Sequence, residues 1–110
     1  MAYIRKKVSS YKWKVTIESP SEDGSNTFEL QEFTCTFKKI STSLIKKLSN
    51  KGDADLLEAV LVGWEGIEEE DGTAITCTTS NKKEFIDDPY WARGVVKGYL
   101  ESLEGASSKN

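Results

Sequence analysis

The side chains that could do chemistry in this 110-residue chain are its carboxylates and two thiols, because the sequence contains no histidine. Without imidazole, the chain lacks the most common general base and the most common metal ligand of proteins. A Ser-His or Cys-His nucleophile pair therefore cannot be built. Paired carboxylates could still transfer protons, but most of the eighteen acidic side chains are expected to lie in water. The sequence predicts no catalytic residue, no cofactor and no enzyme activity.

Two cysteines and one acidic run are the remaining candidates for metal binding. Cys35 and Cys77 stand 42 positions apart, each between threonines, which is not the short spacing of zinc ligands. We expect both to be small apolar side chains in the core, with reduced thiols. The run Glu68–Asp71 lacks the alternating ligands and the distant glutamate of a calcium loop, so it is expected to be a solvated turn. The sequence predicts no metal site.

The charges are divided unevenly along the chain, although the net charge is only −3. Residues 1–52 hold ten basic and five acidic side chains, whereas residues 53–110 hold five and thirteen. Two solvated faces would account for this division. A polarised surface, whose basic end attracts the acidic end of another copy or an acidic partner, is the alternative. The basic first half also admits nucleic-acid binding, but the negative net charge argues against it.

Two strands are predicted in the first half of the chain, and they are the first elements that would position these residues. Trp13, Val15 and Ile17 alternate with polar residues, which is the period of a half-buried strand. A dense cluster of turn-forming residues follows at positions 19–26. A second apolar run then extends from Phe28 to Phe37. We expect an antiparallel pair with residues 19–26 as its loop.

The second strand changes the phase of its apolar residues. Phe28 and Leu30 are even-numbered, whereas the apolar residues between Phe33 and Phe37 are odd-numbered. Because a shift of one residue moves a side chain to the other face of a sheet, we expect a bulge or bend near Gln31–Glu32 that returns both sets to one face.

Caps and apolar stripes predict helices in the middle of the chain. The run Ser41-Thr-Ser offers caps for a short helix whose apolar residues lie between positions 44 and 48. Asp53 can cap a second helix, in which residues 56–61 supply one apolar stripe that runs on into Trp64. The sequence therefore predicts a helix that ends at a Gly-Trp step.

Two further helices are predicted near the end of the chain. Asn81 and Glu84 fit a capping box for a short helix. Asp88 followed by Pro89 fits the start of a longer helix, which we expect to stop at Gly105.

A pair of glycines, Gly94 and Gly98, stands four residues apart within this last helix. Each glycine costs roughly 1 kcal/mol relative to alanine in a helix. The pair is either tolerated as a weak stretch or needed for close packing against another helix, in the fold or in a partner.

The order of these elements predicts an α+β fold. We expect an N-terminal antiparallel β-hairpin, then a small helical bundle with a short second hairpin around Asp71–Gly72. Residues 1–110 should form a single domain, with residues 1–10 and 105–110 as flexible ends. No apolar run approaches the roughly 18 residues of a membrane-spanning helix, and no signal-peptide core opens the chain, so a cytoplasmic protein is expected.

One ordered set of motifs resembles a known family. It comprises the strand that ends at Phe33–Ile40, the apolar run that leads to Gly63, Trp64 and Gly66, the acidic Asp71–Gly72 turn, and the last helix introduced by Asp88 and Pro89. This order resembles that of the tail assembly chaperones of long-tailed (siphophage-type) bacteriophages and prophages. The resemblance covers roughly residues 12–104, and its distinctive part is the Gly63-Trp64-x-Gly66 step followed by Asp71–Gly72.

The resemblance implies a non-enzymatic protein that binds the long, helical tape measure protein and keeps it soluble until the tail tube polymerises. It places the chain in the host bacterial cytoplasm and outside the mature virion. The other partners it implies are the major tail tube protein and a frameshift-extended form of the chain, and the divided charges also admit a homo-oligomer. No membrane partner is expected.

Aromatic side chains at the centre of an interface carry much of its binding energy. Tyr90, Trp91 and Tyr99, together with Gly94 and Gly98, are therefore our candidates for partner contact, with core packing as the alternative for each. Trp64 is expected to anchor the second helix in the core, with Gly63, Gly66, Asp71 and Gly72 shaping the turn after it. A tail structural or completion protein and a small nucleic-acid-binding regulator remain as alternative functions.

Overall fold

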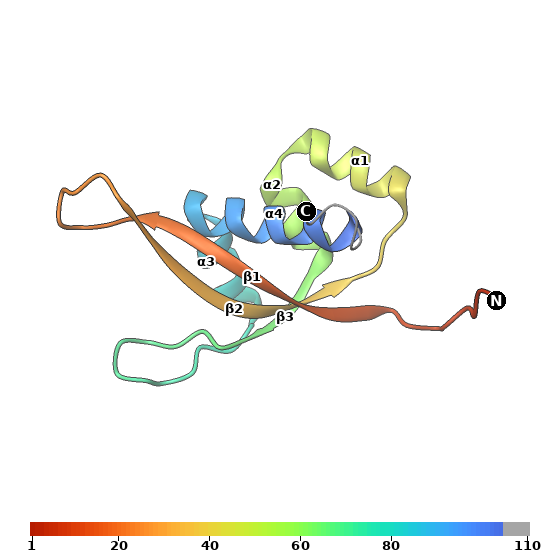
Figure 1. The fold of residues 1–110 in the computed structure, drawn as a ribbon, viewed down its shortest axis with the longest axis horizontal. Coiled ribbons are helices and arrows are strands. Elements are labelled where there is room, and N and C mark those ends of the chain that lie inside the picture. Colours follow the sequence, from red (N-terminus) through yellow and green to blue (C-terminus); the bar gives the residue numbers. More distant parts are fainter. Residues whose placement is uncertain (105–110) are drawn as a thin grey trace.

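The chain folds into a three-stranded antiparallel sheet with helices packed against one of its faces (Figure 1). The computed structural model describes residues 1–104. The elements are β1 (Ser10–Pro20), β2 (Phe28–Lys38), α1 (Thr42–Lys51), α2 (Asp53–Val60), β3 (Leu61–Glu65), α3 (Thr79–Ile86) and α4 (Pro89–Glu104). The predicted α+β class and the N-terminal hairpin are confirmed. The predicted stop at Gly105 and the end segment 105–110 lie outside the described residues.

Strands β1 and β2 form one long hairpin whose pairing is continuous from end to end. The bulge predicted near Gln31–Glu32 is therefore wrong. The ladder stays regular, and Phe28 and Leu30 emerge on the face away from the helices, where they are 60% and 65% exposed. The phase of the apolar residues changes because this end of β2 carries apolar side chains on its open face.

Strand β3 replaces the last turn of a predicted helix. Helix α2 ends at Val60, and the following residues, Leu61–Glu65, pair antiparallel with β2. A register shift at Thr36/Phe37 marks the irregularity in this pairing. The helical prediction fails here because a short apolar run is compatible with both a helix and a strand. In the fold, the backbone N–H and C=O groups of this run find their partners in β2. Trp64 thus sits on a strand, directly opposite Cys35.

Two of the predicted helix starts are confirmed. The Ser41 hydroxyl accepts a hydrogen bond from the backbone N–H of Leu44 at 3.2 Å. The Asp88 carboxylate accepts one from the backbone N–H of Tyr90 at 3.0 Å, with Pro89 as the first residue of α4. Local side-chain chemistry is enough to define these two starts.

The other two helix starts differ from the prediction. Gly52 occupies the cap position of α2, and Asp53 is already helical. Helix α3 starts three residues earlier than its predicted capping box at Asn81 and Glu84, because the hydroxyl of Thr78 accepts the N–H of Asn81 at 3.1 Å. A threonine and an asparagine are both good caps, so the local sequence did not distinguish them.

The second predicted hairpin is a loop that doubles back on itself, and its two arms are joined by an isolated antiparallel bridge between Glu68 and Ala74 instead of two regular strands. The backbone N–H of Ile75 donates to the carbonyl of Ile67 at 2.8 Å. At the tip, the carboxylate of Asp71 accepts the N–H of Thr73 at 2.9 Å. Hydrogen bonding from the side chain and then the backbone of Thr73 lowers the pKa of Asp71. We call residues 66–75 the acidic loop.

A single cluster of buried side chains joins the sheet to the helices. Cys35 is fully buried in it, and burial raises the pKa of its thiol to about 12. Cys77 is half-buried at its edge, where burial also raises the pKa of the thiol. Both thiols are free, and Cys35 is the small core side chain that the sequence predicted.

Helix α4 lies directly on β1 because two glycines remove the side chains between them. A Cβ atom at Gly94 would stand 2.7 Å from the carbonyl oxygen of Thr16, and one at Gly98 would overlap the side chain of Val15. Of the two interpretations of this pair, close packing is correct, but the neighbour is a strand and not another helix.

We expect Gly94→Ala to destabilise the fold by about 1–3 kcal/mol, the range for overpacked sites. In an open helix the same change would stabilise by roughly 1 kcal/mol, so the sign of the effect reports the contact with β1. Urea denaturation measures the difference. The exposed neighbour Lys97→Ala is the control and should stay within about 0.5 kcal/mol of the parent. A Gly94→Ala variant that is more stable than the parent would contradict this packing.

Candidate functional site

A groove of about 380 Å³ opens at the end of the sheet nearest the β1–β2 loop. It lies between this end of the sheet, the acidic loop and the start of α4 (Figure 1). Its floor is apolar and its rim is acidic, so we call it the acidic groove. The floor consists of Ile17, Phe33, Ile67, Ile75, Phe85 and Trp91. The rim carries Glu32, Glu68, Glu69, Glu70 and Asp88, with Tyr90 at one edge.

The floor is built from aromatic rings that arrive from three elements. Phe33 of β2 stacks on Trp91 of α4, with ring centroids 5.7 Å apart and planes 13° from parallel. Phe85 of α3 lies 5.3 Å from the same indole. Aromatic contacts of this kind contribute about 0.5–1.5 kcal/mol beyond their buried area. The floor is therefore a rigid part of the core and not a flexible surface.

Trp64 fixes the wall of the groove to this floor. Its indole N–H donates to the carbonyl of Ile75 at 2.7 Å, which attaches the returning arm of the acidic loop to β3. Its ring meets Phe85 and Trp91 edge-on, at 5.3 and 5.6 Å. Trp64 is 9% exposed and lies in the core as predicted, although it anchors a strand and not the second helix.

The glycines beside Trp64 let the chain turn into the acidic loop. Gly66 has φ +88°, and a Cβ there would touch Phe33 at 3.6 Å. Gly72 has φ +89° at the tip of the loop, in the left-handed region that favours glycine. Gly63 has ordinary backbone angles and lies against Thr36. The motif Gly63-Trp64-x-Gly66 with Asp71–Gly72 thus shapes one wall of the groove.

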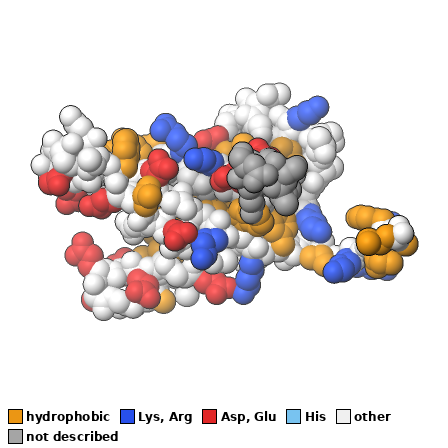
Figure 2. All heavy atoms as spheres, in the orientation of Figure 1, with side chains coloured by type: hydrophobic (Ala, Val, Ile, Leu, Met, Phe, Trp, Pro, Cys, Tyr) orange, Lys and Arg blue, Asp and Glu red, His pale blue; other side chains and the backbone are white. Residues whose placement is uncertain are grey.

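The charges around the groove have one sign. Five carboxylates line it, and within residues 1–104 no lysine or arginine does. Figure 2 shows acidic side chains gathered at this end of the molecule. A concave surface with one sign of charge and an apolar floor attracts ligands of the opposite sign. The groove is suited to apolar side chains that are flanked by lysine or arginine.

The partner-binding residues predicted from sequence do not form one surface. Trp91 and Tyr99 are 5% and 1% exposed and belong to the core. Gly94 and Gly98 are covered by β1. Tyr90 is 39% exposed and lies at an edge of the acidic groove, and Trp91 lies in the floor of the same groove. Core packing, the alternative weighed for each aromatic residue, therefore describes Trp91 and Tyr99.

Sequence reasoning missed the residues that make the groove. Ile67, Ile75 and Phe85 come from segments that are separate along the chain, and the acidic run was interpreted as a solvated turn. The available signal was the placement of that run between two isoleucines, Ile67 and Ile75. An acidic turn flanked by apolar residues can present its charges beside an apolar surface.

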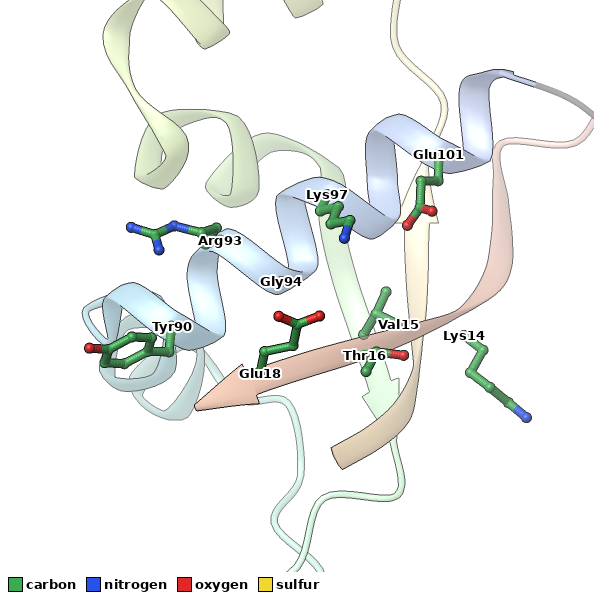
Figure 3. Close-up of a pocket in the computed structure, with 9 residues that line it drawn as sticks. All are labelled: Lys14, Val15, Thr16, Glu18, Tyr90, Arg93, Gly94, Lys97 and Glu101. Atoms are coloured by element: carbon green, nitrogen blue, oxygen red, sulfur yellow. The ribbon is translucent and has the colours of Figure 1, made fainter. Parts of the chain in front are cut away.

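A second hollow of about 360 Å³ follows the seam between α4 and β1 (Figure 3). Figure 3 shows Arg93 and Lys97 on the helix and Glu18 on the strand around Gly94. Lys14 and Glu101 continue this mixture of signs. Because charges of both signs line the seam and its centre is the glycine contact, the acidic groove is the better candidate for a binding site.

Within residues 1–104, no group of three or more His, Cys, Asp or Glu side chains is placed to hold a metal ion. No helix in that part of the chain is long and apolar enough to cross a membrane. Comparison of the chain with family models, with curated proteins and with solved structures found no match.

We expect Trp64→Phe to lower the free energy of unfolding by about 1–3 kcal/mol, because it leaves the half-buried carbonyl of Ile75 without its donor. The acidic loop should also lose protection from amide hydrogen exchange at Ile75, since its attachment to β3 is gone. Val62→Thr is the control, because Val62 is 51% exposed on the same strand and the change keeps a β-branched side chain. Equal exchange rates at Ile75 in Trp64→Phe and in the parent would contradict the role of the indole.

Proposed function

We propose that this chain is a tail assembly chaperone of a long-tailed phage or prophage, and that it acts by binding and not by catalysis. The observation that carries the proposal is the ordered motif set around Gly63, Trp64, Gly66, Asp71 and Gly72. In the fold Gly66 lines the acidic groove, and Trp64 supports the groove wall from behind through its hydrogen bond to Ile75. The residues that carry the resemblance therefore also shape the best candidate for a binding surface.

The groove suits a client of defined chemistry. Its apolar floor would take apolar side chains from a helical segment, and its five carboxylates would meet lysine or arginine beside them. The resemblance implies that the client is a tape measure protein, a long helical chain whose apolar surface must be covered to keep it soluble. The client segment that fits is an amphipathic helix with basic residues along the border of its apolar face.

The groove is small, so a single contact would be weak. A stable protein interface buries about 800 Å² on each partner, whereas a site with a few large side chains covers less. Weak contacts repeated along a long client become strong together through effective concentration. Weak single contacts also suit a chaperone that must be displaced when the tail tube assembles.

The first test is co-expression with a tape measure protein from the same phage or prophage genome. We expect the parent chain to keep the client soluble and to co-purify with it. The variant Glu69→Lys/Glu70→Lys should lose most of this effect, at least about tenfold in the amount of complex, because it places two positive charges on the rim.

The matched control is Glu101→Lys/Glu104→Lys, which makes the same charge change on exposed residues at the far end of α4. It should retain the complex. If the parent chain neither solubilises the client nor co-purifies with it, the proposal fails. Equal loss in both double variants would place the effect in the net charge and not in the groove.

Purified virions provide an independent readout. A chaperone is absent from the finished particle, whereas a tail structural or completion protein is a fixed component of it. Mass spectrometry of virions should therefore detect no stoichiometric amount of this chain. Its presence at a fixed ratio to the tail tube protein would overturn the chaperone role.

A further inference from the structure

The first nine residues form an extended segment, which we call the N-terminal arm, with apolar side chains held in water. Residues 1–9 carry no helix or strand, and Tyr3, Ile4 and Val8 are 92%, 71% and 44% exposed. Three basic residues, Arg5, Lys6 and Lys7, follow the Tyr-Ile pair directly. An exposed apolar pair beside a basic run is suited to an acidic surface that has an apolar centre.

The arm and the acidic groove lie at opposite ends of the molecule. The arm leaves the first residue of β1 and points away from the body, whereas the groove lies at the far end of the same strand (Figure 1). The molecule is 53 Å long in this direction. Figure 2 shows basic and apolar side chains along the arm at one end and acidic side chains gathered at the other. The extended arm therefore points away from the groove of its own chain.

The chemistry of the arm matches that of the groove. The arm offers an apolar pair followed by three positive charges, and the groove offers an apolar floor bordered by five negative charges. We propose that the N-terminal arm of one copy docks in the acidic groove of a second copy, with Tyr3 and Ile4 toward the floor and Arg5–Lys7 along the rim. In an extended chain five residues span roughly 16 Å, which is enough to reach from a groove floor to its border.

The arm and the groove are different surfaces at opposite ends of the molecule. Two copies that exchange arms reciprocally form a closed two-fold dimer, whereas copies that each dock their arm on the next one form an open row or a ring. The inference does not depend on the identity of the client. If the client uses the same groove, arm and client compete for it, and self-association falls as the client binds.

A charge exchange between two full-length variants tests the contact. One variant carries Glu69→Lys/Glu70→Lys in the groove, and the other carries Arg5→Glu/Lys6→Glu/Lys7→Glu in the arm. Each alone should remain monomeric in analytical ultracentrifugation at concentrations where the parent associates. When the two variants are mixed, the unchanged arm of the groove variant fits the unchanged groove of the arm variant, so association into pairs should return. Circular dichroism confirms that each variant is folded.

Two further measurements separate this contact from other causes of association. Tyr3→Ser/Ile4→Ser keeps all charges and should weaken association at least about tenfold, because the apolar pair is lost. Glu101→Lys/Glu104→Lys should associate as the parent does. Added salt should weaken association of the parent, since the rim contacts are exposed.

Three results would overturn the inference. A parent chain that is monomeric at every concentration would exclude docking between copies. Unchanged association in Tyr3→Ser/Ile4→Ser would exclude the arm, and a mixture of the charge variants that stays monomeric would exclude the groove. A monomeric parent that binds a DNA duplex through Arg5–Lys7 would assign the arm to nucleic acid instead.

Discussion

The hydrogen bond from the Trp64 indole to the carbonyl of Ile75 is the interaction on which the candidate site depends. It connects β3, the last strand of the sheet, to the segment that returns from the acidic loop. The same indole packs edge-on against Phe85 and Trp91, which are the floor of the groove. One side chain therefore fixes the position of the wall relative to the floor. The acidic residues of the loop stand beside an apolar surface because this indole holds the loop there.

The close contact between α4 and β1 has a comparable role for the rest of the core. Gly94 and Gly98 let the helix backbone approach the strand, and this approach places Trp91 at the start of the helix against Phe33 of β2. The groove thus forms where the helix, the sheet end and the acidic loop meet. A binding surface built on such rigid contacts needs little ordering when a partner arrives, which lowers the entropic cost of binding.

Local patterns predicted much of this fold, whereas the features set by distant contacts were not predictable. Alternation identified the strand around Val15, and the Asp88 cap identified the start of α4. The apolar pattern predicts that the helix continues after Val60. These residues form a strand because they pair with β2, a contact that the local pattern does not reveal. Close packing is one of two interpretations that the sequence allows for Gly94, but its neighbour is a strand more than 70 residues away, which the local sequence does not identify. The groove was missed for the same reason, since its parts meet only in the folded chain.

The most direct test of the proposed site is the indole region of a ¹H–¹⁵N spectrum, in which the three tryptophans give separate signals. The probe is the tape measure segment that the proposed function assigns to the groove. Trp91 lines the groove floor and Trp64 supports its wall, whereas Trp13 lies outside the groove lining. We predict that adding the segment shifts the signals of Trp91 and Trp64 and leaves that of Trp13 unchanged. A complex that forms with no change at Trp91, or with a change at Trp13 alone, would contradict the assignment of client binding to the acidic groove.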